Sequence, residues 1–209
     1  MNNVSLIRSD GPQSDPYVLE NLFRLRHKVF YETLRWEVNS VNGQERDHYD
    51  DLKPVYPVSC DRYGRVTGTM RLLPTTGPYM LADVFPQLLR GEEPPRGEHI
   101  WEISRFAVLS PDDPNRERAQ AQLNSDTFHL LRCAARFARQ QQIEEYVFVT
   151  SVALERLLRR LGLDVKRFGD ARARKVGKVL SVACRLAIDE QTCRTLHVPF
   201  SQTKKRQAA

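Results

Sequence analysis

The sequence predicts an α/β fold, in which a mixed β-sheet is covered by helices on both faces. Three observations predict it: a helical pattern opens the chain, apolar strands joined by short turns follow, and helices then alternate with strands. The 209 residues fit a single domain spanning 1–209, large enough to bury a substantial core. We expect residues 201–209 to form a frayed tail.

Local patterns predict the individual elements. Apolar residues recur at helical spacing over most of residues 16–34, which predicts a helix. The polar and acidic residues 37–53 predict a loop, here called the acidic loop. The patterns that follow predict, in order, a β-hairpin (54–61 and 65–74), helical turns broken at Pro86 (81–89), a buried strand (100–109), a long amphipathic helix (124–142), a buried strand (146–152), a helix ending at Gly162 (153–162), an edge strand (164–169), a strand (178–188) and a short last helix (189–200).

The composition excludes several classes of protein. Hydrophobic residues make up 41% and charged residues 28% of the chain, as in ordinary globular proteins. The sequence has no run of eighteen apolar residues and opens without the apolar stretch of a signal peptide, so we expect a cytoplasmic protein without a membrane span. The 4 cysteines lack metal-site spacing, so we expect free thiols and no metal.

The net charge of +6 is unevenly distributed. Residues 132–178 hold 12 Lys/Arg against 5 Asp/Glu. Such an asymmetry suggests an acidic partner, although a solvated basic face without a partner is also possible. Aromatic residues do not alternate with the basic ones and no nucleic-acid-binding motif is present, so we expect no nucleic-acid partner.

Four charged side chains stand in apolar surroundings. Arg26 lies on the first helix, Arg71 on the hairpin, and Glu102 and Arg105 on the strand at 100–109. Each has a structural explanation: Arg26 could extend to solvent from a helix edge, Arg71 could end its strand in solvent, and Glu102 and Arg105 could form an edge ion pair. Singly, none of them identifies a site.

The spacing within the strand at 100–109 constrains its side chains. In a regular strand Glu102, Ser104 and Phe106 share one face and Arg105 lies on the other. We therefore expect Glu102 and Arg105 to face different sides. If both served one site, a bulge or sharp twist would have to lie between them.

Several stretches carry these residues in a characteristic order. They are RLRHKVFYETLRW (Arg26, Phe30 and Trp36), RDHYD (Asp47 and Asp50), GTMRLLPT (Arg71), LADVFP (Phe85) and WEISRFAV (Glu102 and Arg105). No GxSxG elbow, Walker A loop, HExxH motif or Rossmann fingerprint is present. From about residue 6 to residue 200, the chain resembles the acyl-homoserine-lactone synthases, the bacterial autoinducer synthases of quorum sensing.

The resemblance implies a fold related to the N-acetyltransferases, an α/β/α sandwich whose central sheet splits into a V. It also implies the reaction. The α-amine of S-adenosylmethionine (SAM) attacks an acyl thioester, and the SAM carboxylate then attacks its own γ-carbon, which closes the lactone and expels methylthioadenosine. SAM is a substrate here, and no cofactor is expected. The chain lacks the Gly-rich phosphate cradle of ordinary acetyltransferases, as a donor carried by acyl carrier protein allows, but an acyl-coenzyme A donor remains possible.

The resemblance also implies roles for individual residues. An α-amine has a pKa of about 8, so its deprotonation at neutral pH costs about 1 kcal/mol, while an ordinary glutamate falls about 3.5 pH units short of it as a base. A general base would therefore need burial or a relaying water, and a proton acceptor and an ammonium anchor both remain possible roles for Glu102. The implied sites are catalysis (Glu102 and Arg105), SAM binding (Arg26, Phe30, Trp36, Arg71 and Phe85), loop ordering (Asp47 and Asp50) and an acyl pocket (Ser104, Phe106 and Phe148).

Some of these roles have alternatives. The arginines suit either recognition of a carboxylate or bracing of the acidic loop. Phe30 and Trp36 suit either a wall around the SAM sulfonium or plain core packing. Phe148 stands where relatives that make 3-oxo products carry a threonine, which favours an unsubstituted, short, branched or aromatic acyl group.

The resemblance also suggests a protein partner and leaves an alternative activity open. An acidic acyl carrier protein could dock on the basic third of the chain, and we expect a monomer. An N-acyltransferase that acts on a different amine without lactone formation is the alternative activity. The candidate docking cluster comprises Arg136, Arg139, Arg156, Arg159, Arg160, Lys166 and Arg167.

Overall fold

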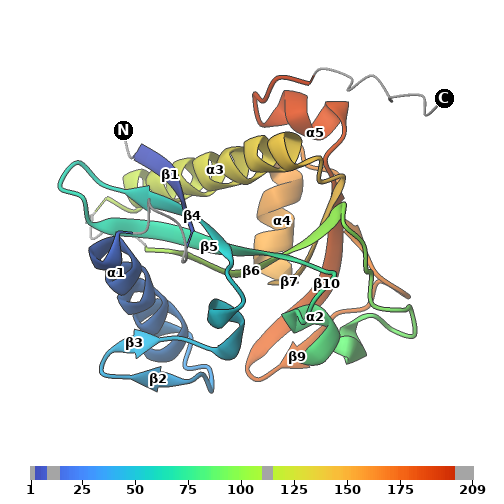
Figure 1. Ribbon diagram of the computed structural model, residues 1–209, viewed down its shortest axis with the longest axis horizontal. Coiled ribbons are helices and arrows are strands. Elements are labelled where there is room, and N and C mark those ends of the chain that lie inside the picture. Colours follow the sequence, from blue (N-terminus) through green and yellow to red (C-terminus); the bar gives the residue numbers. More distant parts are fainter. Residues whose placement is uncertain (1–2, 9–14, 110–114, 201–209) are drawn as a thin grey trace.

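A mixed eight-stranded sheet runs through the middle of the protein, in the order β1-β4-β5-β6-β7-β10-β8, with β9 paired to β10 (Figure 1). The computed structural model describes residues 3–8, 15–109 and 115–200. Only β6 and β7 run parallel among its pairs. The strands are β1 (Asn3–Arg8), β4 (Val55–Cys60), β5 (Val66–Pro74), β6 (Ile100–Val108), β7 (Glu145–Ser151), β8 (Lys166–Arg167), β9 (Arg174–Val176) and β10 (Val179–Ala187).

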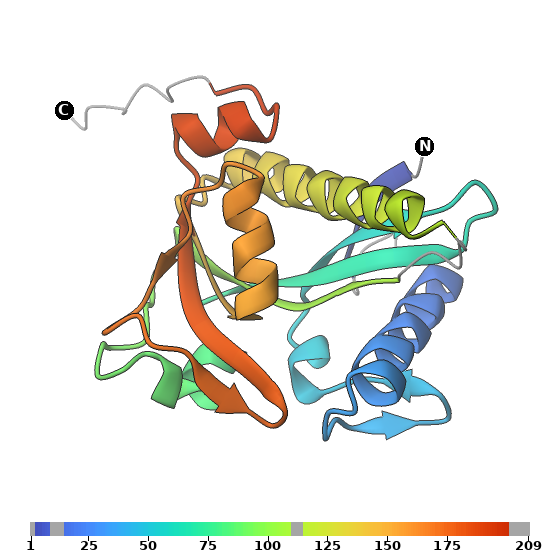
Figure 2. The ribbon, with the colours of Figure 1, turned by 180° about the vertical axis from the view of Figure 1, so that it is seen from behind.

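Helices cover both faces of this sheet, as predicted. Figures 1 and 2 show α1 and α2 on one face and α3 and α4 on the other, with α5 beside the end of α3. The helices are α1 (Pro16–Arg26), α2 (Met80–Asp83), α3 (Arg116–Gln141), α4 (Val152–Arg160) and α5 (Glu190–Thr195), with a π-helix at His27–Thr33 and short 3₁₀ helices at His48–Asp51 and Pro86–Leu88. A separate hairpin, β2 (Ser40–Val41) and β3 (Gln44–Glu45), lies within the acidic loop.

The sheet splits between its two parallel strands. β6 and β7 pair from Ile100 with Glu145 to Ile103 with Phe148. Beyond these pairs β6 continues to Val108 alongside β5, and β7 continues to Ser151 alongside β10. The two halves therefore diverge, which confirms the V-shaped split.

Several predicted elements differ in detail. The first helix changes to π-helical geometry at His27, the acidic loop contains a hairpin and a 3₁₀ turn, and α3 begins at Arg116 instead of near Asn124. The sequence analysis missed the edge strands β1 and β9. The predicted tail at 201–209 lies outside the described residues.

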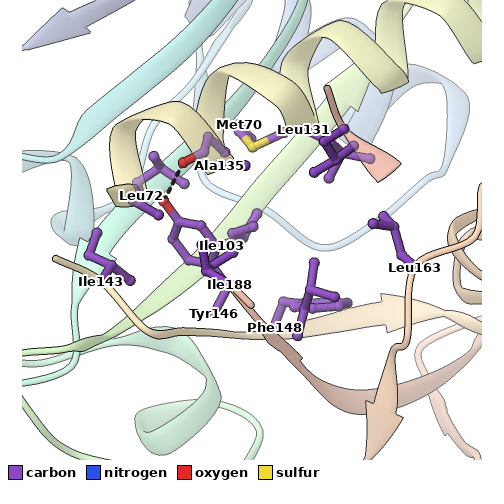
Figure 3. Close-up of a cluster of buried hydrophobic side chains, with 14 of the residues drawn as sticks. Met70, Leu72, Ile103, Leu131, Ala135, Ile143, Tyr146, Phe148, Leu163 and Ile188 are labelled. Atoms are coloured by element: carbon purple, nitrogen blue, oxygen red, sulfur yellow. Dashed lines mark hydrogen bonds between the residues drawn. The ribbon is translucent and has the colours of Figure 1, made fainter. Parts of the chain in front are cut away.

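The largest core lies between the sheet and α3 and α4. Met70 and Leu72 of β5 and Tyr146 and Phe148 of β7 point into it, because alternate strand residues face the same side (Figure 3). The buried Tyr146 hydroxyl donates to the carbonyl of Ala134 at 2.9 Å, so the phenol brings no unpaired polar group into this core.

Two further expectations were tested by the structure. All four cysteines are free thiols, as predicted. In the ranges 3–8, 15–109 and 115–200, no helix is both long and apolar enough to cross a bilayer.

Leu130 provides a test of this core. Its side chain is fully buried in α3 and its Cδ1 faces Gly68 of β5. Leu130→Ala should lower the free energy of unfolding by about 2–5 kcal/mol, from lost burial and the cavity left behind. The same change at Leu180, which is 49% exposed, should cost less than about 1 kcal/mol. Equal losses in urea unfolding would contradict this assignment of the core.

Candidate active site

The candidate site lies on the α1 and α2 face of the sheet, where the acidic loop crosses β5 and β6. Arg71 comes from β5, Glu102 and Arg105 come from β6, and Arg26 is the last residue of α1. The acidic loop meets them with Glu45, Asp47 and Asp50. Residues from four separate stretches of sequence thus converge in one place.

Arg26 is completely buried, so the expectation of an arginine extending to solvent is wrong. Its Nε donates to Glu45 at 2.5 Å, and its two Nη atoms donate to the two oxygens of Asp50 at 2.8 and 2.9 Å. Burial opposes the charge of Arg26, but attraction to Asp50 and Glu45 outweighs it and raises the pKa of the guanidinium. Arg26 therefore fixes the acidic loop to α1.

Arg71 is also completely buried, so it does not end its strand in solvent. Its Nη1 donates to Asp47 at 2.5 Å and to Asp50 at 2.9 Å, and its Nε donates to the hydroxyl of Ser104 at 3.1 Å. Arg71 therefore fixes the acidic loop to the sheet. Of the two roles left open for the arginines, bracing of the loop is the one this structure contains.

Arg105 stands in a β-bulge. The pairs Thr69 with Ala107 and Arg71 with Ser104 leave two residues of β6 opposite Met70 alone. Arg105 has a φ of 51°, a left-handed conformation that costs a non-glycine residue about 1–3 kcal/mol. The distortion that a shared site requires is therefore present between Glu102 and Arg105.

The bulge turns Arg105 to the same side as Glu102, so the expectation of opposite sides is wrong. Arg105 donates to Glu45 at 3.0 Å and forms an ion pair with Asp47 at 2.7 Å. Its Nη1 lies 3.2 Å from the sulfur of Met80, the residue whose backbone also contacts Glu102. Burial lowers the pKa of Arg105, against the attraction of Glu45 and Asp47.

Glu102 is 1% exposed and binds the start of α2. Its two carboxylate oxygens accept the backbone N–H groups of Met80 at 3.1 Å and Leu81 at 2.6 Å. It forms no ion pair with Arg105 within the described ranges, so the edge-pair interpretation is wrong. Burial raises the pKa of Glu102, against these two N–H groups and Arg71, which brings the carboxylate closer to the range of a general base.

Asp50 is the centre of the ion network. Its carboxylate accepts hydrogen bonds from Arg26, Arg71, the Tyr56 hydroxyl at 2.7 Å and the backbone of Asp47. Burial alone would raise its pKa, but Arg26 and Arg71 outweigh burial and lower the pKa well below the usual range. The sequence analysis missed Glu45 and Tyr56, although Glu45 stands inside the acidic loop.

Aromatic side chains border the ion network. Phe30 and Trp36 stack with ring centroids 5.3 Å apart, and the Arg105 guanidinium lies 5.6 Å from the Phe30 centroid. Phe30 is buried and Trp36 half-buried, and Trp36 Nε1 is a buried donor with no partner in the residues described. Phe85 packs against the small cluster formed by Tyr49, Leu73 and Met80. Phe30 and Trp36 both pack in the core cluster beside α1, as the core-packing interpretation expected, and the sulfonium wall stays a prediction.

The three residues expected in an acyl pocket do not share one face. Phe106 and Phe148 pack in the core under α3 and α4. Ser104 lies on the opposite face and binds Arg71, because the bulge reverses the alternation between Ser104 and Phe106. Ser104 thus groups with Glu102, while the two phenylalanines line the far side of the split.

Several basic side chains in the last third of the chain already pair with a carboxylate of the protein. Arg159 and Arg167 both pair with the buried Glu155, at 3.2 and 2.5 Å. Lys166 lies 3.5 Å from Asp164, Arg139 contacts the ring of Phe200, and Arg136 lines a cavity beside β1. Arg156 and Arg160, one turn apart on α4, are exposed and pair with no carboxylate in the part of the chain that is described.

Across the described ranges, no group of three or more His, Cys, Asp or Glu side chains is arranged to hold a metal ion.

The sequence of this chain is similar to a known protein family and to several of its members. The family described as autoinducer synthase matches residues 13–196. An acyl-homoserine-lactone synthase of Pseudomonas aeruginosa is 38% identical over 85% of this chain and 86% of its own length. One from Aliivibrio fischeri is 37% identical over 90% of this chain and 95% of its own length.

Solved structures agree with this. The crystal structure of the AHL synthase LasI has a TM-score of 0.85 and 36% identity, and covers 97% of this chain and 99% of its own. The structure of TofI with an inhibitor and MTA has a TM-score of 0.79 and 32% identity, and covers 94% of this chain and 97% of its own. The structure of BjaI, a CoA-dependent acyl-homoserine lactone synthase, with SAM and isopentyl-CoA has a TM-score of 0.80 and 29% identity. It covers 96% of this chain and 92% of its own. A structure described as an N-acetyltransferase from Lactobacillus plantarum, with a TM-score of 0.55 and 15% identity, shares the fold alone.

Asp50 and Asp51 form a matched pair for testing the network. Asp50→Asn should lower the free energy of unfolding by about 3–5 kcal/mol, because two buried guanidiniums lose a charged partner. Asp51→Asn should cost less than about 1 kcal/mol, because Asp51 is 65% exposed. Urea unfolding measures both.

Urea unfolding measured at several pH values tests how the contribution of Asp50 to the free energy of unfolding changes with pH. The folded pKa of Asp50 lies below its unfolded value of about 3.9, so its contribution is complete above that pH and is lost as the pH falls further. Asp50→Asn should lose less stability than the wild type over this acid range. A steeper loss in the variant would contradict the assignment of Asp50 as the centre of the network.

Proposed function

Since the chain belongs to the autoinducer synthase family and is an acyl-homoserine-lactone synthase, we propose that Glu102 receives the α-amine of SAM beside Arg105. The observation that carries this proposal is the buried carboxylate of Glu102, turned to the same face as the arginine network by the bulge. A buried carboxylate can anchor the ammonium and, with its raised pKa, accept the proton directly or through water. SAM is the substrate, and the relatives with SAM or MTA support this role.

The reaction needs modest chemistry from the protein. Once the amine has attacked the thioester, the SAM carboxylate attacks the γ-carbon and the sulfonium leaves as methylthioadenosine. Because the nucleophile is tethered to its target, holding the chain in position supplies most of what lactone closure requires. Phe30 is buried and stacked on Trp36, so the half-buried ring of Trp36 is the aromatic face that suits the sulfonium, where such contacts contribute about 0.5–2 kcal/mol.

The arginines position this site through the acidic loop. Arg26 and Arg71 have no exposed surface, and their side chains donate to Glu45, Asp47 and Asp50, to Ser104 and to the sulfur of Met80. Their contribution to SAM binding is therefore to order the loop. Arg105, with a side chain 10% exposed, is the arginine best placed to approach the substrate carboxylate.

The acyl chain is proposed to lie across the split from Glu102. Phe106 and Phe148 present an apolar surface on the α3 and α4 side, next to the point where β6 and β7 part. Phe148 fills space there that a smaller residue would leave open, which favours a short, branched or aromatic acyl group. The thioester would then sit at the split, between the two substrates.

The proposed acyl donor is an acyl carrier protein, with acyl-coenzyme A as the alternative. Arg156 and Arg160 present two exposed positive charges on one side of α4, which suits an acidic partner. Glu155 pairs with both Arg159 and Arg167 and offsets one of their two positive charges, so these two arginines stabilise the fold around α4 and contribute less to docking.

The activity is tested directly by its products. The purified protein is incubated with SAM and a panel of acyl carrier protein and acyl-coenzyme A donors, and methylthioadenosine and lactone are measured by mass spectrometry. We expect both products in equal amounts with at least one donor. Acylation of another amine without methylthioadenosine would indicate the alternative N-acyltransferase. Absence of both products over a broad panel would contradict the proposal.

Glu102→Gln tests the catalytic role. If Glu102 accepts the proton, kcat should fall by about 10²–10⁴ with a smaller change in the KM for SAM. In the wild type, kcat should fall on the acid side as Glu102 is protonated, with a midpoint above the ordinary glutamate value of about 4.3, and the variant should lack this dependence.

Glu98→Gln, at an exposed position, is the matched control for Glu102→Gln and should leave kcat unchanged. The melting temperature must also be compared, because Glu102 holds the start of α2. A Glu102→Gln variant that keeps kcat within about twofold of the wild type would remove Glu102 from the mechanism.

Charge reversal tests the docking surface. Arg156→Glu with Arg160→Glu should raise the KM for acyl carrier protein donors several-fold, most strongly at low salt, because the steering charge is reversed. Arg62→Glu with Arg65→Glu, on the exposed hairpin turn between β4 and β5, controls for net charge. An equal effect of the two double variants would argue against docking at α4.

A further inference from the structure

A small cavity lies on the face of the sheet opposite Glu102, beside β1. It has a volume of about 170 Å³ and is lined by Val4 of β1 and by His129, Arg132, Cys133 and Arg136 of α3. β1 is the edge strand of the sheet and runs alongside α3 (Figure 1). The cavity is therefore separate from the site formed by the acidic loop.

The sequence of α3 places three cationic or protonatable side chains along one line. His129, Arg132 and Arg136 follow each other at spacings of three and four residues, so they lie on one side of the helix. Two like charges at a spacing of four residues on a helix repel each other. Such an arrangement is stabilised when an anion lies between the charges.

The two arginines of this cavity lack a counter-ion among residues 3–8, 15–109 and 115–200. Arg132 Nε is buried without a hydrogen-bond partner, and in the described part of the chain no carboxylate lies within 4 Å of Arg132 or Arg136. Arg26, Arg71 and Arg105 each pair with two carboxylates. A buried guanidinium N–H without a partner is unfavourable, because it has lost its water without gaining an acceptor.

We propose that the cavity between α3 and β1 binds a phosphate group, either free inorganic phosphate or a phosphate monoester. The planar guanidiniums of Arg132 and Arg136 offer paired N–H donors that match phosphate oxygens, and His129 adds a third donor. Burial raises the pKa of the Cys133 thiol to about 11, against the nearby Arg136, so the thiol stays neutral and does not repel an anion.

Titration with phosphate tests the proposal on the full-length protein. Inorganic phosphate is added in a non-phosphate buffer at constant ionic strength, and binding is followed by ³¹P NMR line width and by the melting temperature. We expect saturable binding in the wild type and affinity weaker by about tenfold or more in Arg132→Met, since a charge-assisted hydrogen bond is lost. Arg136→Met, at an exposed position, gives a second variant whose folding should be unaffected.

Control measurements separate a specific site from general charge effects. Arg118→Met removes an exposed arginine from the same helix and should bind phosphate as the wild type does. Glu102→Gln should also bind normally, because Glu102 lies on the other face. Binding that is equal in Arg132→Met and Arg118→Met, or a melting-temperature shift reproduced by sodium chloride at the same ionic strength, would overturn the proposal.

The source of the phosphate is resolved by comparing two probes. Tighter binding of glycerol phosphate than of inorganic phosphate would assign the cavity to a phosphate monoester on a larger molecule, and the reverse order would assign it to the free ion. Either order of affinities supports the proposal if Arg132→Met weakens the binding of both probes. Failure of both probes to bind would reject it.

Discussion

The site depends on the balance of charge around Asp50. Three guanidiniums and three carboxylates are gathered from α1, the acidic loop and strands β5 and β6. Removing such ions from water costs several kcal/mol each, and the arrangement is tolerable only when the partners are complete. Asp50 completes two of the pairs and also accepts the hydroxyl of Tyr56, which ties β4 to the same centre. A change in one member therefore affects the position of the whole loop.

The β-bulge at Arg105 connects this charge balance to the candidate chemistry. A left-handed residue in a strand is unfavourable by itself, and the ion pairs of Arg105 with Glu45 and Asp47 offset that cost. In return, Arg105 and Glu102 lie on one side of β6, on either side of Met80. Glu102 then holds the first N–H groups of α2, so the loop, the strand and the short helix are positioned together. We attribute the preorganisation of the site to this linkage.

The sequence predicted the regular elements better than the site. The hairpin, α3, α4 and the strand of Phe148 have clear periodicity, and the mixed sheet followed from their order. The edge strands β1 and β9 are short, with six and three residues, and gave no clear signal. Strand alternation correctly required a bulge if Glu102 and Arg105 were to share a site, but it could not place that bulge, so the faces of Arg105 and Phe106 were misassigned. The carboxylate partners of Arg26 and Arg71 are tertiary contacts 19–24 residues away, which local patterns do not contain.

The split in the sheet explains how two unlike substrates can meet. Glu102 lies on the α1 and α2 face, whereas Phe106 and Phe148 lie on the α3 and α4 face. A continuous sheet would separate these faces, because its backbone ladder leaves no passage for a chain. The ladder between β6 and β7 stops at Ile103 and Phe148, one residue after Glu102. A thioester at this point would have its acyl chain in the apolar layer and its carbonyl within reach of an amine held at Glu102. The proposed reaction therefore requires the split at this register, next to the buried carboxylate.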